Sequence, residues 1–103
     1  MTRTVSPEFT AAYERAWHID GANNEERLNL YAYAKIAKQE EDIKTASTPG
    51  IFDLTAKAKR KRWQKFVDED ISPEDAEKQY IAAVAEMVGK YGLKADCPEN
   101  LKI

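Results

Sequence analysis

The sequence predicts an all-α protein built as a four-helix bundle. Four stretches of the chain repeat apolar residues at intervals of three and four, the spacing of an amphipathic helix. No stretch alternates apolar and polar residues between tight turns, as a strand would. The chain has 103 residues, of which 43% are hydrophobic and 33% charged, with four Gly and four Pro. Such a length and composition predict one small domain with a single core.

The first helix is predicted from Ser6-Pro7-Glu8, an N-cap followed by a proline at the first helical position and an acid in the first turn. Its buried stripe comprises Phe9, Ala12, Tyr13 and Ala16. We expect it to end near Asp20-Gly21, because glycine readily adopts the left-handed conformation that closes helices.

The second helix is predicted to begin at Asn23, with Glu26 completing a capping box. The residues expected on or beside one face are Leu28, Leu30, Tyr31, Ala32, Ala34, Lys35 and Ala37. The pattern ends in Glu40-Glu41-Asp42, and Ala46-Ser47-Thr48-Pro49-Gly50 is a loop by composition. This long connection is either functional or a plain crossover.

Asp53 is expected to cap a third helix, which contacts the core through Trp63, Phe66 and Val67. The acidic run Asp68-Glu69-Asp70 is expected to end that helix.

The fourth helix is predicted to begin at Ser72-Pro73, a cap followed by an N1 proline, and to close at Gly92. Its apolar stripe comprises Ala76, Tyr80, Ala83, Val84, Met87, Val88 and Tyr91. We therefore expect one domain over residues 1–93. Residues 94–103 show no periodicity and are expected to follow the surface as a tail without regular structure.

Charge and motif content argue against several classes of protein. Sixteen basic and eighteen acidic residues give a net charge of -2, so a general affinity for nucleic acid is not expected and any anion site must be local. His18 is the only histidine, and neither a metal-binding cluster nor a GxSxG or phosphate-loop motif occurs. We expect no catalytic site, no metal and no cofactor.

The amino terminus and the cysteine content bear on location. Met1 to Pro7 lacks the apolar run of a signal peptide. The single cysteine, Cys97, cannot pair within the chain, which fits a reducing compartment. A cytoplasmic location is therefore expected.

The strongest local feature is a basic segment in the third helix. It comprises Lys57, Lys59, Arg60, Lys61, Arg62 and Lys65. It fits a solvated helix face, an anion-binding surface, or a nucleic-acid or nuclear-targeting segment. Lys59 lies one turn before Trp63, so a buried Trp63 would place Lys59 at the edge of the core-facing stripe.

Lys35 repeats this arrangement one turn beyond Tyr31. A lysine there either extends to water over its own stem or meets an anion bound in a cleft. Tyr31 and Tyr80 lie on core-facing stripes, where tyrosines usually supply packing and a hydroxyl that needs a partner.

In their order and spacing, several motifs together resemble the acyl-CoA-binding protein family over about residues 6 to 93. These motifs are Leu28-Asn29-Leu30-Tyr31 with Lys35, Pro49-Gly50-Ile51-Phe52-Asp53, Lys57-Ala58-Lys59 with Trp63, Glu74-Asp75-Ala76, Tyr80-Ile81 and Lys90-Tyr91-Gly92. The resemblance implies an up-down-down-up bundle with a long loop between the second and third helices. It also implies a monomeric carrier that binds long-chain acyl-CoA one to one without turnover.

By resemblance, the family's ligand-binding positions fall on Tyr31, Lys35, Lys59 and Tyr80. Coenzyme A carries a 3'-phosphate and a pyrophosphate, so two cations and tyrosine hydroxyls at a groove edge would form charge-assisted hydrogen bonds with it. The implied partners are the acyl-CoA itself and, transiently, membranes or acyl-CoA-using enzymes.

The sequence departs from the family pattern in several places, among them Thr55, which stands where some members have a basic residue at the start of the third helix. Ala34 stands where many members have a tyrosine that packs on the adenine, and Tyr33 would replace it only through a local change in helix register. Trp17 stands at or next to the position where some members have a basic residue in the first helix that is directed at the phosphates. Arg60 replaces a tryptophan and is expected to restore a cation. The alternative function is a helical interaction module whose basic third helix binds anionic lipid surfaces or nucleic acid.

Overall fold

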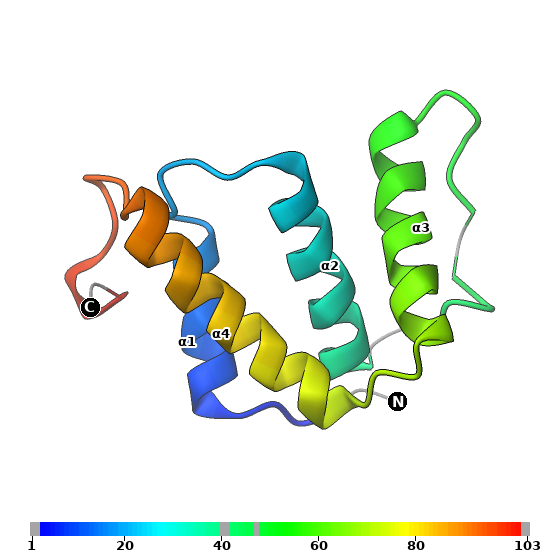
Figure 1. Ribbon diagram of the computed structural model, residues 1–103, viewed down its shortest axis with the longest axis horizontal. Helices are drawn as coiled ribbons and strands as arrows, with labels where there is room; N and C mark the ends of the chain where they lie inside the picture. The colour runs from blue at the N-terminus through cyan, green and yellow to red at the C-terminus, as the bar shows by residue number, and fades with distance from the viewer. Residues whose placement is uncertain (1–2, 40–41, 47, 102–103) are drawn as a thin grey trace.

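The protein is a bundle of four α-helices followed by a short 3-10 helix. The computed structural model describes residues 3–39, 42–46 and 48–101. The elements are α1 (Pro7–Ala16), α2 (Asn24–Lys38), α3 (Leu54–Asp68), α4 (Pro73–Tyr91) and η1 (Glu99–Leu101). Figure 1 shows α1 and α4 running in one direction and α2 and α3 in the other, with a long loop between α2 and α3. The predicted all-α, up-down-down-up bundle is confirmed.

All four helices begin at the predicted caps, Ser6, Asn23, Asp53 and Ser72. Each cap side chain accepts a hydrogen bond from the backbone N–H three residues further on, at 2.8 to 3.1 Å. At Asn23 the capping box is complete, because the Glu26 carboxylate accepts a hydrogen bond from the Asn23 N–H at 3.0 Å. Short polar side chains thus fix where every helix starts.

The end of α1 differs from the prediction. The helix ends at Ala16 rather than near Asp20-Gly21. Beyond it, Ile19 forms an isolated antiparallel bridge with Leu93, and the N–H of the residue after Leu93 donates to the His18 carbonyl at 2.7 Å. Because these backbone groups pair with the chain that follows α4, they are not available to continue the helix.

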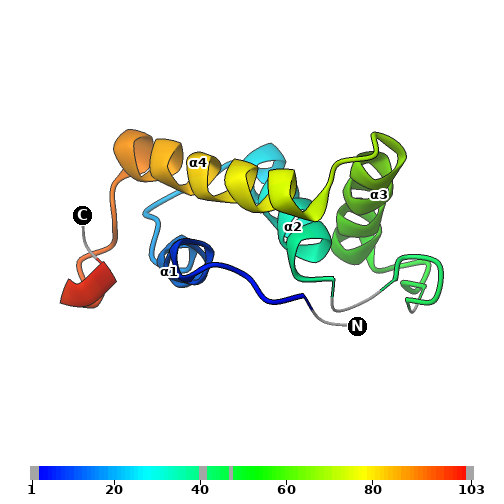
Figure 2. The same ribbon diagram turned by 90° about the horizontal axis from the view of Figure 1, so that it is seen from below.

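The helices pack in a chain of contacts rather than all against all. α1 lies on α4, and α2 lies on both α4 and α3, as the two ribbon views show (Figure 2). No Cα atoms of α1 and α2 come within 8 Å of each other. The space between α1 and α2 is therefore left to side chains, with α4 closing one side of it.

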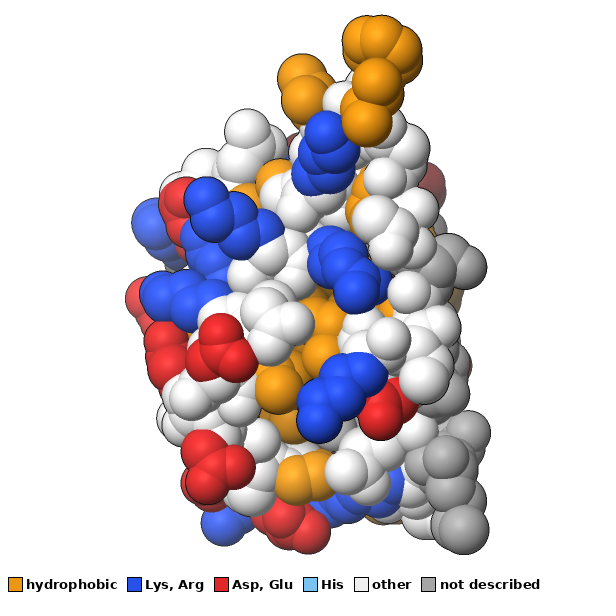
Figure 3. Space-filling view, turned by 90° about the vertical axis from the view of Figure 1, so that its right-hand side faces the viewer, with side chains coloured by type: hydrophobic (Ala, Val, Ile, Leu, Met, Phe, Trp, Pro, Cys, Tyr) orange, Lys and Arg blue, Asp and Glu red, His pale blue; other side chains and the backbone are white. Residues whose placement is uncertain are grey.

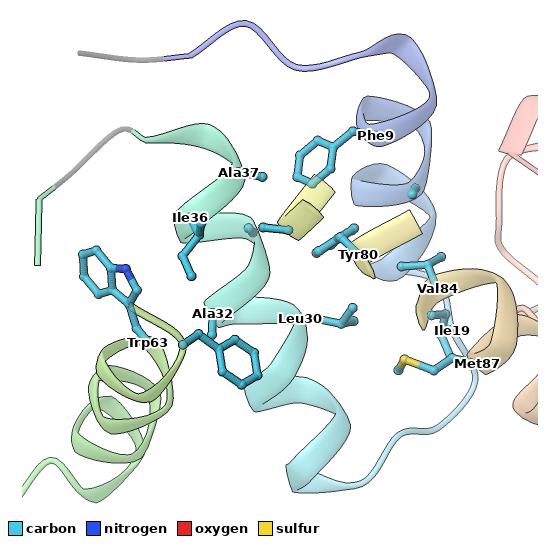
Figure 4. Close-up of a cluster of buried hydrophobic side chains, with 14 of the residues drawn as sticks. Phe9, Ile19, Leu30, Ala32, Ile36, Ala37, Trp63, Tyr80, Val84 and Met87 are labelled. Atoms are coloured by element: carbon cyan, nitrogen blue, oxygen red, sulfur yellow. The ribbon is translucent and has the colours of Figure 1, made fainter. Parts of the chain in front are cut away.

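The core lies where α4 meets α1 and α2 (Figure 4). Phe9 and Val84 are fully buried, and the rings of Phe9 and Tyr80 lie 4.8 Å apart. On the other side of α2, Trp63 and Phe66 of α3 are buried as predicted. Val67 was expected to touch the core but is 38% exposed, because α3 packs on α2 alone and only a narrow stripe of it is covered.

The segment after α4 is more ordered than predicted. Residues 99–101 form η1, and Cys97 and Leu101 are buried. The Arg15 Nε atom donates to the Leu101 carbonyl at 2.7 Å, which fastens η1 to α1. The expectation of an irregular surface tail is therefore wrong for these residues, whose apolar side chains find cover on α1. The domain boundary at residue 93 stays a prediction.

The loop between α2 and α3 is held by α3 itself. The Arg60 guanidinium donates to the carbonyls of Ile43 and Ala46 at 2.9 and 3.4 Å. Ile43 is buried against the core. The acidic pair Glu40-Glu41 and Ser47, which the sequence assigns to this loop, lie outside the described residues. Within the described part of the chain, no helix has the length and apolarity needed to cross a membrane.

Candidate ligand-binding groove

A groove of about 560 Å³ opens between α1 and α2, with side chains of α4 at its base. Fifteen residues line it: Tyr13, Ala16, Trp17, Ile19, Ala22, Arg27, Leu30, Tyr31, Ala34, Lys35, Lys38, Lys59, Tyr80, Met87 and Lys94. The lining combines apolar and aromatic side chains with five cations. It includes no carboxylate among the residues that the structure describes.

One face of α2 supplies six of the fifteen lining residues. Its members are Arg27, Leu30, Tyr31, Ala34, Lys35 and Lys38. They follow the three- and four-residue spacing of a helix, so one side of α2 presents all six to the groove. The capping box at Asn23 fixes the start of α2, which sets the position of this face.

Two of the cations lie close to the ring of Tyr31. The Lys35 Nζ atom lies 5.6 Å from the centre of the Tyr31 ring, and the Lys59 Nζ atom lies 5.4 Å from it. Lys35 Nζ is also 5.3 Å from the centre of the Trp63 ring. These ring contacts hold the two ammonium groups near each other at the edge of the groove, where their charges would act together on an anion.

The base of the groove is aromatic and apolar. Tyr80 is 3% exposed, and its ring lies 6.0 Å from that of Tyr13. Burial raises the pKa of the Tyr80 hydroxyl, so this group stays protonated and keeps a proton to donate. The Lys38 Nζ atom stands 3.9 Å from the centre of the Tyr13 ring.

The structure brings together most of the side chains that the sequence singled out. Tyr31, Ala34, Lys35, Lys59 and Tyr80 all line this one groove, although they come from three helices. The arrangement of Lys35 near Tyr31, and of Lys59 at the edge of the stripe that carries buried Trp63, follows the sequence interpretation.

Tyr33 is the predicted site residue that lies elsewhere. Its ring packs 4.7 Å from the ring of Phe66, between α2 and α3. Burial raises the pKa of its hydroxyl, and the nearby Glu69 carboxylate adds to the effect. Because α2 runs as an α-helix from Asn24 to Lys38, no change of register turns Tyr33 toward the groove.

Arg60 is also directed away from the groove. Its guanidinium bonds to the carbonyls of the loop, and its side chain is not part of the groove lining. The expectation that it restores a cation beside Lys59 is therefore not met. A loop that leaves carbonyl groups near α3 gives this guanidinium partners on the opposite side.

The sequence interpretation missed several lining residues. Arg27 lies one turn before Tyr31, and Lys38 lies one turn beyond Ala34, so helical spacing alone could have found both. Trp17 lies one turn beyond Tyr13, at a position where the family resemblance places a basic residue, so the sequence did point to it. Lys94 carried no comparable signal, because it reaches the groove through the Ile19–Leu93 bridge, a pairing between distant segments of the chain.

Among the described residues, no group of three or more His, Cys, Asp or Glu side chains is placed to hold a metal ion. A helical bundle with a groove that is cationic at its edge and apolar at its base has the properties of a binding protein for an amphipathic anion.

Comparison with known proteins gives the family. A sequence profile described as "Acyl CoA binding protein" matches residues 6–84. The chain therefore belongs to the acyl-CoA-binding protein family.

Named relatives agree with this assignment. "Acyl-CoA-binding protein homolog 1" of Caenorhabditis elegans is 39% identical over 70 residues, covering 68% of this chain and 77% of the relative. "Acyl-CoA-binding protein homolog" of Drosophila melanogaster is 35% identical over 88 residues, covering 84% and 98%. "Acyl-CoA-binding protein" of Saccharomyces cerevisiae is 38% identical over 69 residues, covering 67% and 75%.

Proposed function

We propose that this protein binds long-chain acyl-CoA one to one, as a carrier and buffer that does not turn its ligand over. The observation that carries the proposal is a single groove lined by five cations and no described carboxylate at its edge, with aromatic and aliphatic side chains at its base. A ligand that fits must be anionic at one end and apolar at the other. The family assignment and the names of the relatives support the same ligand.

The cations would hold the phosphates of the coenzyme. The ammonium groups of Lys35 and Lys59 lie 5.6 and 5.4 Å from the centre of the Tyr31 ring, and ammonium groups bind phosphate oxygens through charge-assisted hydrogen bonds. Arg27 and Lys94 extend the positive lining. No described residue of the lining carries a carboxylate, so the phosphates would meet no negative charge from these residues.

The apolar base would cover the acyl chain. Leu30, Met87 and the ring of Tyr80 line it. Each buried methylene contributes about 0.8 kcal/mol, so covering half of a sixteen-carbon chain would contribute about 6 kcal/mol. Chain length should therefore dominate the differences in affinity among acyl-CoAs.

Isothermal titration calorimetry tests this function directly. We expect palmitoyl-CoA to bind with a stoichiometry of one and palmitate to bind much more weakly, because palmitate lacks the phosphates. Palmitoyl-CoA should also raise the melting temperature of the protein. Equal affinity for the two ligands would contradict the role of the cations.

Finer features complete the proposal. We propose that the carrier is a cytoplasmic monomer and that its groove supports binding without catalysis. Size-exclusion chromatography with light scattering tests the monomer. Incubation with palmitoyl-CoA followed by thiol titration tests for hydrolysis, which we expect to stay at the uncatalysed rate.

Delivery of the ligand would involve a brief contact with a membrane or an acyl-CoA-using enzyme. Ile51, Phe52 and Leu54 are 71%, 91% and 74% exposed where the loop enters α3. Figure 3 shows hydrophobic side chains projecting at the edge of this face, with Lys and Arg side chains below them. We expect Phe52→Ser to slow transfer of palmitoyl-CoA to vesicles without changing its affinity. An unchanged transfer rate would contradict this contact.

The alternative, an interaction module that uses the basic third helix instead of a ligand groove, has no support from the family or the relatives. The structure also divides the basic segment. Lys59 faces the groove, whereas Arg62 bonds to Asn29 and Glu25 of α2 and Arg60 bonds to the loop. The segment is therefore not one uniform surface for a polyanion.

A further inference from the structure

Trp17 is an exposed aromatic side chain at the wall of the groove. It is the C-cap residue of α1, and 71% of it is exposed to solvent. Exposing a large indole has a free-energy cost, because its apolar surface remains in contact with water. The other tryptophan, Trp63, is 4% exposed. Trp17 thus leaves most of its surface in solvent while it lines the groove.

The remaining aromatic rings of the groove have other contacts. Tyr13 packs near Phe9 and Tyr80 and has the Lys38 ammonium above its ring. Tyr31 has the ammonium groups of Lys35 and Lys59 near its ring. For Trp17, no ring or cation contact occurs among the described residues. Of the three rings, the indole of Trp17 is therefore the one that a planar ligand group could cover while displacing the fewest protein groups.

The backbone that carries Trp17 is held in place. The Trp17 N–H donates to the Glu14 carbonyl at 3.3 Å. The next residue, His18, accepts from the Lys94 N–H, and Ile19 forms the bridge to Leu93. Because the backbone is already anchored, a ligand that covers the ring has to order only the two side-chain torsions of Trp17.

The groove also has room for a planar group. Ala34, which lines the groove from α2, carries only a methyl group. Along α2, Arg27 lies two turns before Ala34 and Lys38 lies one turn after it, so longer side chains flank the short one. The lining that a flat ring would enter between α1 and α2 thus contains the indole of Trp17, one short side chain and several cations.

We infer that Trp17 stacks on the nucleobase of the bound coenzyme and makes the groove prefer thioesters that carry a nucleotide over those that do not. The inference rests on the proposed function and assigns to α1 the aromatic contact that α2 lacks at Ala34. Base–aromatic stacking suits this position, because it needs an accessible ring face and no fixed hydrogen bond. Trp17 would act on specificity for the head group and leave the acyl chain unaffected.

The decisive measurement compares two ligands on two proteins. Palmitoyl-CoA carries the base, whereas S-palmitoyl-4'-phosphopantetheine keeps the acyl chain and one phosphate but lacks the adenosine. We expect Trp17→Ala to weaken palmitoyl-CoA binding by about 5- to 100-fold, the range of a lost stacking contact, and to leave the second ligand unchanged. The exposed position of Trp17 means that this variant should fold normally.

Matched variants separate stacking from other effects. Trp17→Phe keeps a smaller ring and should retain most of the preference for palmitoyl-CoA. Phe52→Ala removes another exposed ring, one that lies outside the groove, and should change the affinity for neither ligand. If Trp17→Ala weakened both ligands by the same factor, Trp17 would be a structural residue and the inference would be wrong.

Fluorescence supplies a second readout. The chain has two tryptophans, so Trp17→Phe leaves Trp63 as the sole indole. We expect adenosine 3',5'-bisphosphate, which has the base and phosphates but no acyl chain, to quench the fluorescence of the wild-type protein and not that of Trp17→Phe. Equal quenching in both proteins would overturn the inference. Failure of wild-type protein to bind palmitoyl-CoA at all would instead contradict the proposed function.

Discussion

In the α1–α4 pair the rings of Phe9, Tyr13 and Tyr80 lie within 4.8 to 6.1 Å of one another, whereas the α2–α3 pair has one such contact, between Tyr33 and Phe66. Polar links join both pairs. Glu77 of α4 accepts hydrogen bonds from the Ser6 N–H and the Arg3 guanidinium at the start of α1, and Arg62 of α3 donates to Asn29 and Glu25 of α2. The pairs therefore differ in their apolar contacts, because a continuous cluster of rings holds the first pair and a narrow apolar seam holds the second.

The same division separates the two ends of the proposed ligand. Four of the five cations in the groove come from α2 and α3, whereas the apolar base combines Leu30 of α2 with Tyr13 of α1 and with Tyr80 and Met87 of α4. Changes at the buried rings of the first pair should mainly alter the free energy of unfolding. Changes on the groove side of the second pair should alter affinity and its dependence on salt.

The largest expected effect is in the aromatic core. Phe9→Ala should lower the free energy of unfolding by about 3 to 5 kcal/mol, because a fully buried ring is removed and a cavity is left. Urea denaturation followed by far-UV circular dichroism measures this. Trp63→Ala is the matched variant on the other side of α2. It should cost a similar amount but raise amide exchange first in α3, which contacts α2 alone. If amide exchange rose equally in all four helices of both variants, the two helix pairs would not differ in local stability.

The next effect is on affinity. Lys59→Ala should weaken palmitoyl-CoA binding by about 1.5 to 3 kcal/mol through a lost charge-assisted contact, with little change in melting temperature. Lys61→Ala is the control, because Lys61 lies on the same helix but outside the groove. Calorimetry at low and moderate salt measures both. If Lys59→Ala bound palmitoyl-CoA with wild-type affinity, the basic segment would be a solvated helix face rather than part of the ligand site.

A smaller effect is expected from adding a ring to α2. Ala34→Tyr should tighten palmitoyl-CoA binding by about 0.5 to 1.5 kcal/mol, because it would add a second ring to the groove lining to stack on the nucleobase. A thioester that lacks the adenosine should gain nothing. Ala34 is 8% exposed, so a loss of affinity or of melting temperature would mean that the tyrosine has no room to turn into the groove.

The smallest effect concerns the contact that joins α2 to α4. Tyr91 donates to the Glu26 carboxylate at 2.6 Å, and the Asn23 N–H and the Lys90 ammonium also approach it. These hydrogen bonds hold the pKa of Glu26 below its ordinary value of 4.5. The carboxylate therefore stabilises the fold above that value, and its contribution is lost as the pH falls through the lowered pKa.

Glu26→Gln tests this contribution. Near neutral pH the variant should be slightly less stable than the wild type, and the difference should shrink as both proteins are acidified below pH 4.5. Thermal melts between pH 3 and 7 measure it. If the difference in stability between the two proteins grew toward acid pH, the charged form of Glu26 would not be the form that stabilises the fold.

The sequence could predict most of the fold because its signals are local. Ser6, Asn23, Asp53 and Ser72 each cap a helix through a bond to a backbone group three residues away, and such a bond needs nothing from the rest of the chain. The same holds for the groove face of α2, since helical spacing alone places Tyr31 and Lys35 side by side.

The parts that could not be predicted depend on pairing between distant segments. The early end of α1 and the exposure of Trp17 follow from the Ile19–Leu93 bridge, and burial of Leu101 follows from its contact with α1. Tyr33 shows the same limit on a smaller scale. Two residues from Tyr31, it turns to Phe66 because α3 happens to cover that side of α2.

The order of packing also bears on how the chain is made. α1 is the first helix to be synthesised, yet among the four helices its partner is α4, the last. At a synthesis rate of about 5 to 20 residues per second, α1 would wait several seconds for residues 73–91. During that time Phe9 has no core to enter. The groove, which needs Lys94 as well, would be completed only once the whole bundle has left the ribosome, so that the nascent chain would acquire its ligand site as its final step.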